Sequence, residues 1–191
     1  MTIVTKTFSS APEAMQFLES LACGNGNFVF RGHSRVAYRL QTTLRRHTST
    51  PVEPWGTYLD DMIAAFQVGL AKLKLTPFDS KERIDWMEYG RHHALPTPVL
   101  DFSYSPYVAL YFAFDGRRID YKNPDADHVA VYALDVESLA SAWATVSHTP
   151  GSDEWSEARR QFLNPPANFL KSRFETSSLR FLPSPGRFNF R

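Results

Sequence analysis

The sequence predicts an α+β fold, as a single compact domain over residues 1–191 with helices packed on a mostly antiparallel sheet. A chain of 191 residues is long enough for one sizeable core but short for two. Hydrophobic residues make up 43% of the chain and charged residues 21%, which is usual for a globular protein. Helical and strand-like patterns alternate along the chain, and no repeat or interdomain linker separates them.

The first expected helix begins at a capping signal. Ser10 followed by Glu13 forms a capping-box pattern, apolar residues follow at helical spacing, and Gly24 ends the helix. The aromatic and β-branched residues of "FVF" at 28–30 then predict a strand, which ends at Gly32.

The clearest pattern is that of a long amphipathic helix from about Tyr58 to Leu75. Its apolar residues recur three and four positions apart: Leu59, Met62, Ile63, Phe66, Leu70 and Leu73. A second helix is expected after Ser80 and is weakened at Gly90. Two prolines make the segment at 96–98 extended.

The second half of the chain predicts a helix, a strand and two short helices. Ser105 is the expected N-cap of a helix with Pro106 at its first position, and because "PYVALYFAF" is apolar on nearly every side, this helix is expected to be buried. "HVAVYALDV" predicts a core strand, and short helices are expected near 137–144 and 153–163. The proline-containing tail from Asn164 is expected to be irregular and to wrap the core.

The charged residues are unevenly distributed although the formal net charge is only +1. No acid lies between Glu19 and Glu53, where five arginines fall, and basic residues again outnumber acids after Ser156. If the fold joins the two basic segments, they form a surface that attracts anions; the alternative is that they are solvated faces. A nucleic-acid-binding protein usually has a stronger basic excess, so nucleic acid stays an open but less favoured partner.

Cysteine content and hydropathy indicate the compartment. The single cysteine, Cys23, excludes an internal disulfide and a cysteine-based metal site. The N-terminal residues lack a long apolar core behind a basic start, so no secretory leader is expected, and no apolar stretch approaches the roughly 18 residues that a membrane span needs. A cytoplasmic protein without a membrane partner is therefore expected.

Arg31 is a permanent charge within the apolar run "FVFRG". An unpaired buried guanidinium is costly, so Arg31 must meet a carboxylate or an anionic ligand. Asp101, which stands between Leu100 and Phe102, is the candidate carboxylate. Two interpretations stay open: an Arg31–Asp101 ion pair, or an Arg31 that holds the phosphate or carboxylate of a ligand in a cleft. Gly32 would permit the close approach of a ligand, or only a bend.

His92 and His93 do not predict a metal site, because adjacent side chains point in different directions and no third ligand lies at helical spacing. One of the two is expected to be buried, and the other to face the cleft and donate to a ligand. The sequence lacks a phosphate-binding loop, a dinucleotide-binding glycine pattern and a nucleophile elbow. This disfavours nucleoside triphosphate hydrolysis and serine-type acyl transfer.

Two blocks of the sequence, "FVFRGHSRVAYRLQTTLRRH" and "GRHHALPTPVLDFSYSPYVALYFAF", resemble the FRG domain family. The aromatic-Arg-Gly motif of the family corresponds to Phe30, Arg31 and Gly32, and its second block to residues 92–114. The resemblance implies an association with bacteria and their phages.

The closing motif of the family falls near the C-terminal end of the sequence, on Arg180, Ser184, Gly186 and Phe188. The chain departs from the family pattern at four positions, which are Ala94 for Gly, Pro98 for Arg, Phe102 for Trp and Ser184 for Gln. The closing motif here therefore lacks the amide of the family pattern.

The arrangement is further similar to that of ADP-ribosyltransferases, which implies an ADP-ribosyltransferase-like fold and NAD as substrate. In that layout Arg31 would clamp the phosphate, Ser103 would contact the ribose, and Tyr104 and Tyr107 would stack on the nicotinamide. The late acid would be Glu175, which lies outside the family motif, and Asp101 would orient Arg31. Gly32, His33, His92 and His93 complete the ligand-binding candidates, and no metal is expected.

Three functions follow from these features. The first is an enzyme, an NAD-dependent ADP-ribosyltransferase or NAD glycohydrolase with a nucleotide or protein acceptor. The second is a non-catalytic module that binds a nucleotide or a protein. The third is an inhibitor or decoy in the conflict between phage and host, which would act through its surface.

Overall fold

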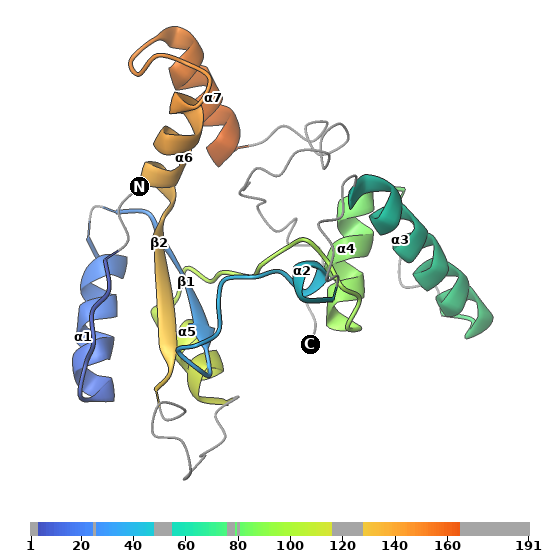
Figure 1. Cartoon of the computed structure of the whole chain (residues 1–191), viewed down its shortest axis with the longest axis horizontal. Coiled ribbons are helices and arrows are strands. Elements are labelled where there is room, and N and C mark those ends of the chain that lie inside the picture. The colour runs from blue at the N-terminus through green and yellow to red at the C-terminus, as the bar shows by residue number, and fades with distance from the viewer. Residues whose placement is uncertain are drawn as a thin grey trace. The chain divides into compact units, whose positions relative to one another are not determined.

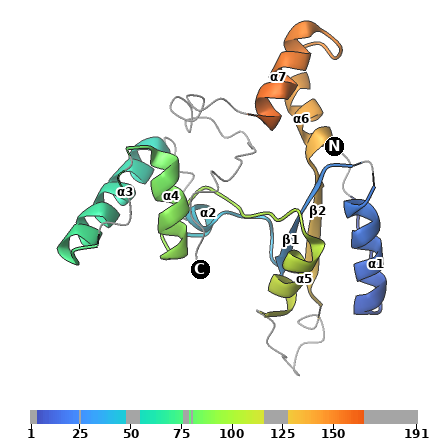
Figure 2. The same cartoon turned by 180° about the vertical axis from the view of Figure 1, so that it is seen from behind.

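The computed structural model describes residues 4–24, 26–47, 55–75, 79, 81–115 and 128–164. The elements follow one another (Figures 1 and 2) as α1 Ala11–Ala22, β1 Phe28–His33, α2 Thr43–His47, α3 Trp55–Lys72, α4 Arg83–His92, α5 Pro106–Asp115, β2 Ala130–Asp135, α6 Val136–Thr145 and α7 Asp153–Leu163. Helices together with an antiparallel pair of strands confirm the predicted α+β class. The predicted tail lies outside the described residues.

The described residues divide into two compact units. The first takes in Met1–Leu40 and Asp101–Leu163, and so contains α1, β1, α5, β2, α6 and α7. The second takes in Gln41–Leu100, with α2, α3 and α4. The single-domain organisation stays a prediction. Within the described residues, no helix combines the length and the apolar character that crossing a bilayer requires.

The sheet of the first unit pairs β1 with β2 in antiparallel register, so that Phe30 lies opposite Ala133 and Arg31 opposite Tyr132. Because side chains alternate between the faces of a strand, Phe30 and Gly32 share one face and Arg31 takes the other. The Phe30 face forms the core, where Phe30 packs with Leu18 of α1 and Ala109 of α5.

Helix α5 packs closely on β1 through a row of small residues. Its buried positions, Pro106, Ala109 and Ala113, follow helical spacing. A Cβ added to Gly32 would overlap the carbonyl oxygen of Ala109 and lie 2.7 Å from the main-chain nitrogen of Ala113. The helix can therefore approach the strand only because position 32 has no side chain.

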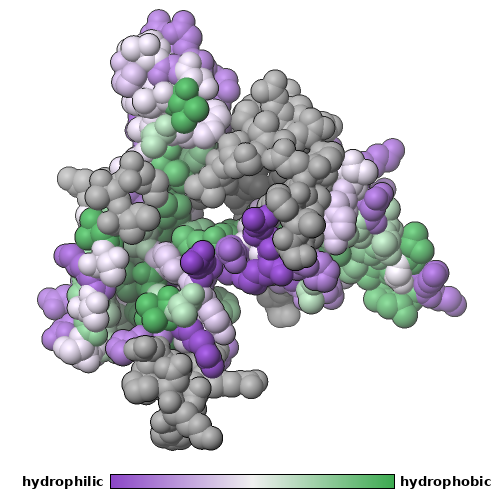
Figure 3. Space-filling model, viewed as in Figure 1, coloured by the Kyte–Doolittle hydropathy of each residue, from purple (hydrophilic) through white to green (hydrophobic). Residues whose placement is uncertain are grey.

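The prediction that α5 is buried all round is wrong. Only the face toward the sheet is covered, and large side chains on the rest of the helix are exposed: Tyr107, Val108, Tyr111, Phe112 and Phe114. Apolar residues also reach the surface over the C-terminal half of α3 and just beyond its end (Figure 3), where Val68 and Leu73 are exposed.

In the second unit, α3 and α4 pack around Leu59, Ile63 and Met87. The predicted long helix at 58–75 is confirmed as α3, which begins three residues earlier and ends at Lys72. Helix α4 continues past Gly90 to His92, further than the sequence indicated. The short helix α2 was not predicted, and Thr43 at its start both donates to the carbonyl of Thr97 and accepts from its N–H.

Helix α4 ends in a Schellman motif. The N–H of Leu95 donates to the carbonyl of Gly90, and that of Ala94 to the carbonyl of Arg91. The motif places Ala94 in the left-handed region, with φ of 63°. Gly90 leaves room for the Leu95 side chain, because an added Cβ would lie 2.6 Å from Cδ2 of Leu95 and would require that side chain to shift.

The remaining helices follow their predicted positions. Ser10 caps α1, where its hydroxyl accepts from the N–H of Glu13 at 3.4 Å. Asp135, the last residue of β2, caps α6 by accepting from two main-chain N–H groups. Helices α6 and α7 pack as a pair through Trp143 against Phe162 and through the ion pair of Arg159 with Glu137.

Candidate functional site

The candidate site lies on the face of β1 that is turned away from α5. Arg31 and His33, two positions apart, share this face, and Tyr132 lies opposite Arg31 on β2. Arg31 and Tyr132 are half-buried, whereas His33 is buried. We call Arg31, His33, Tyr132 and the adjoining Tyr38 the arginine face.

Two hydrogen bonds orient the guanidinium of Arg31. Its Nε donates to Nε2 of His33 at 3.0 Å, and its Nη1 donates to the main-chain carbonyl oxygen of Asp101 at 2.7 Å. Donors that carry a full charge make stronger hydrogen bonds than neutral ones. The fold thus fixes the plane of a permanently charged group.

His33 is the residue that links Arg31 to the aromatic part of the face. Because its Nε2 accepts a hydrogen bond from Arg31, the proton of the neutral ring is assigned to Nδ1, which lies 3.1 Å from the carbonyl oxygen of Tyr38. The ring also contacts Tyr132 edge to face, with centroids 5.1 Å apart. His33 therefore acts as a neutral acceptor toward Arg31.

Tyr38 and Tyr132 were not among the predicted site residues. The hydroxyl of Tyr132 donates to the carbonyl oxygen of Tyr38 at 2.9 Å, the same oxygen that faces His33. The alternation of "HVAVYALDV" could have pointed to Tyr132, because it places Tyr132 on a defined face of its strand. Tyr38 stands in a segment without helix or strand, where no periodic signal exists.

Asp101 and Ser103 reach the site along the other edge of β1. The main chains of Phe30 and Ser103 exchange two hydrogen bonds, of 2.7 and 2.8 Å, which form an isolated antiparallel bridge. This bridge brings the segment of Asp101 beside Arg31. One hydrogen bond that joins the two residues uses the main-chain carbonyl of Asp101. The ion pair of Arg31 with the Asp101 carboxylate stays a prediction.

The other predicted residues of the first unit have structural contacts. The hydroxyl of Ser103 accepts from the N–H of Ser105 at 3.0 Å, just before α5 begins. Tyr107 donates to the carboxylate of Glu19 on α1, and this hydrogen bond raises the pKa of Tyr107 above its ordinary value of 10.0. Tyr104 is exposed. Ligand contacts by Gly32, Ser103, Tyr104 and Tyr107 stay predictions.

His92 and His93 belong to the second unit, at the end of α4. The expectation that one of them is buried is wrong, since both are exposed. The ring of His93 contacts Tyr89 with centroids 4.6 Å apart. In the part of the chain that the structure describes, no three His, Cys, Asp or Glu side chains gather as they would around a metal ion. Glu175 and the closing motif lie outside the described residues.

Comparison with protein-family models gives a match. The FRG domain family model matches residues 26–122. This range includes β1 with Arg31 and His33, and the segment from Asp101 to Ser105. Neither the comparison with curated proteins nor the comparison with solved structures gives a match.

Proposed function

Because the chain belongs to the FRG domain family, we propose that this domain binds a nucleotide through its arginine face, with Arg31 holding a phosphate. The observation that carries the proposal is the fixed orientation of the guanidinium between His33 and Asp101. A planar guanidinium matches the geometry of a phosphate, and a donor that is already oriented loses less entropy when it binds.

The aromatic part of the face supports the same proposal. Tyr132 and Tyr38 lie around the His33 ring, next to Arg31. Aromatic side chains offer a surface for the base or the sugar of a nucleotide, beside the charge that takes the phosphate. Arg31 is half-buried. Solvent therefore screens its charge less than it screens the charge of an exposed arginine.

NAD is the nucleotide that the sequence resemblance to ADP-ribosyltransferases implies. The bridge between Phe30 and Ser103 brings the segment of Ser103 beside β1, but it pairs Ser103 with Phe30 on the core face and not with Arg31, so the ribose contact of Ser103 rests on the resemblance alone. Transfer of ADP-ribose to a protein acceptor, or hydrolysis of NAD, would then be the activity. A cytoplasmic location and a role in conflict between bacteria and phages belong to the same proposal.

The test compares NAD binding by the wild type with that of Arg31→Ala, Arg31→Lys and Arg46→Ala. Arg46 is an exposed arginine of the same basic segment, so its variant controls for the loss of one charge. Loss of a charged hydrogen-bond donor should weaken binding roughly tenfold or more. Arg31→Lys should recover little, because an ammonium lacks the planar fork.

Calorimetric titration with NAD measures binding, and release of nicotinamide measures turnover. No binding of NAD by the folded wild type, or equal binding by wild type and Arg31→Ala, would contradict the proposal. Binding without nicotinamide release would leave the non-catalytic nucleotide-binding module. If Arg31→Ala does not fold, Arg31→Lys, which keeps the charge, supplies the comparison.

A further inference from the structure

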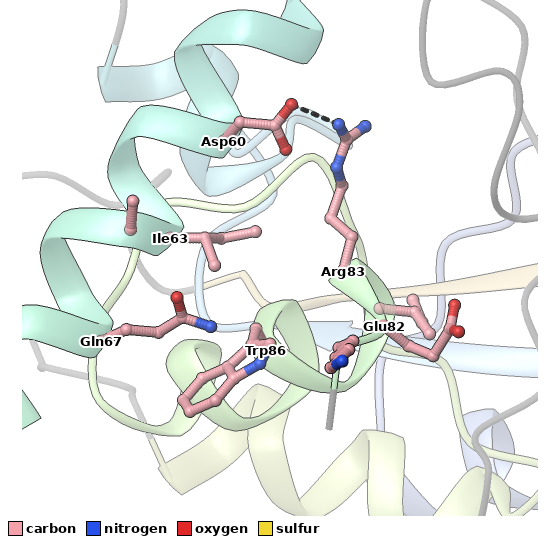
Figure 4. A pocket seen from close by; sticks show the side chains of 9 residues that line it. Asp60, Ile63, Gln67, Glu82, Arg83 and Trp86 are labelled. Atoms are coloured by element: carbon pink, nitrogen blue, oxygen red, sulfur yellow. Dashed lines mark hydrogen bonds and ion pairs between the residues drawn. The ribbon is translucent and has the colours of Figure 1, made fainter. Parts of the chain in front are cut away.

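A cavity of about 490 Å³ lies in the second unit, between α3 and the first turns of α4 (Figure 4). It uses no residue of the arginine face. On α3, Asp60, Ile63 and Gln67 follow one another at spacings of three and four, so they form a row along one side of the helix. On α4, Arg83 and Trp86 are three positions apart and form the opposite wall. Its volume is within the range usual for small-molecule sites, roughly 300–1,000 Å³.

One end of the cavity is lined by apolar side chains. Trp86 is partly buried and packs against the core cluster of Leu59, Ile63 and Met87, which holds the indole in place. Ile63, Ala64 and Ile84 add aliphatic surface. The amide of Gln67 is directed toward the indole (Figure 4). A ring that enters here would meet an aromatic surface and one hydrogen-bonding group.

The charges around the cavity are balanced. Its lining contains two acidic and two basic side chains, which are Asp60, Glu82, Lys81 and Arg83. Asp60 and Arg83 form an ion pair across the upper end of the cavity (Figure 4). An ionic ligand would gain little from such a lining, whereas a neutral planar ligand avoids the cost of taking a charge out of water.

We propose that this cavity binds an adenine base, as part of a free nucleoside or nucleotide. Adenine is flat and uncharged, and it stacks on aromatic side chains. A glutamine amide can donate to and accept from adenine at the same time, which is the pairing that glutamine makes with adenine elsewhere. Trp86 supplies the stacking surface, and Gln67 reads the edge of the ring.

The probe is adenosine, which has no phosphate and therefore tests this cavity apart from Arg31. Adenosine should change the fluorescence of Trp86, and the change should vanish in Trp86→Phe. Gln67→Leu removes the amide at similar volume and should weaken adenosine binding roughly thirtyfold, the middle of the range for a bidentate contact.

Ala64→Phe is the decisive variant. Ala64 is exposed and lines the cavity, so a phenyl ring at position 64 fills the cavity without disturbing the core. The matched control is Ala65→Phe, the same change at the next exposed position of α3, which does not line the cavity. Adenosine binding should be lost in Ala64→Phe and kept in Ala65→Phe and in Arg31→Ala.

Three results would overturn the proposal. The first is no adenosine-dependent signal from the wild type at millimolar concentration, and the second is equal binding by wild type and Ala64→Phe. The third is binding of single-stranded oligoadenylate without binding of adenosine, which would assign the cavity to a base within a strand. Failure of adenosine to bind, with NAD binding still dependent on Arg31, would remove this inference and leave the proposed function.

Discussion

Gly32 belongs to the aromatic-Arg-Gly motif, and in the structure its neighbour is helix α5. The sequence left two explanations for this glycine, the approach of a ligand or a bend. The site where a Cβ would stand is filled by the main chain of Ala109 and Ala113. The glycine and the arginine of the motif thus point to opposite faces of β1, one for packing and the other for the site.

Gly32→Ala should destabilise the protein by about 3 kcal/mol or more, because main-chain atoms of α5 cannot yield to the added methyl group as a side chain could. Urea unfolding followed by circular dichroism measures the effect.

The control is Gly69→Ala in α3, where an added Cβ meets nothing within 4 Å. There the substitution should raise stability by roughly 0.5–1 kcal/mol through helix propensity. Equal stability of Gly32→Ala and the wild type would show that α5 does not pack on β1 as described.

At the scale of residues, the sequence indicated Arg31 as the centre of the site but not what holds it. An arginine in an apolar strand is a conspicuous feature, since a buried charge needs a partner. The hydrogen bond from its Nη1 to Asp101 uses a main-chain oxygen, which every residue type carries, so no sequence pattern specifies that bond. The hydrogen bond to His33 requires that both side chains lie on the same face of the strand. The sequence does predict this, because residues two positions apart in a strand share a face.

At the scale of elements, Ala94 shows how a departure from a family pattern acquires a physical meaning. The FRG family has Gly at this position, and here the motif that ends α4 holds Ala94 at a φ of 63°. A residue with a Cβ is strained in this region, whereas glycine is not. The alanine therefore keeps the turn at a cost in stability.

Ala94→Gly should stabilise the protein by about 1 kcal/mol, through relief of this strain at the end of α4. The measurement is the free energy of unfolding in urea.

Lys74→Gly tests the same reasoning on α3, whose end has the same two hydrogen bonds and a φ of 57° at Lys74. A gain in both variants is expected. A loss of stability in Ala94→Gly would mean that the entropy of the unfolded chain outweighs the strain.

Helix ends were harder to predict than helices. The long apolar pattern of α3 was enough to predict that helix. Its end depends on Lys74 in the left-handed region, where the sequence has no glycine to indicate a helix end. Gly90 was expected to weaken α4, and it instead allows Leu95 to fold back against the helix. The short α2 was missed because five residues are too few for a periodic pattern.

At the scale of the whole molecule, the main error concerns α5. A helix that is apolar on every side is expected to be buried. The sequence does not indicate which side of α5 is covered, because this helix has no polar face that would be expected to point to solvent. In the structure the small residues face β1, and the large aromatic ones are at the surface. Among the described residues this helix carries the densest group of exposed large apolar side chains.

Such a group should be measurable as a property of the molecule, because exposed apolar patches bind apolar dyes and promote association. Phe112→Gln replaces a side chain that is 59% exposed in this group, so it should lower the binding of an anilinonaphthalene dye. Its effect on stability should stay within roughly 0.5 kcal/mol, as for most surface substitutions. The control is Val146→Gln at the end of α6, where an 84% exposed valine lies outside α5 and dye binding should stay unchanged. If Phe112→Gln instead lowers stability by several kcal/mol and leaves dye binding unaltered, then Phe112 is covered in solution and the surface assigned to α5 is wrong.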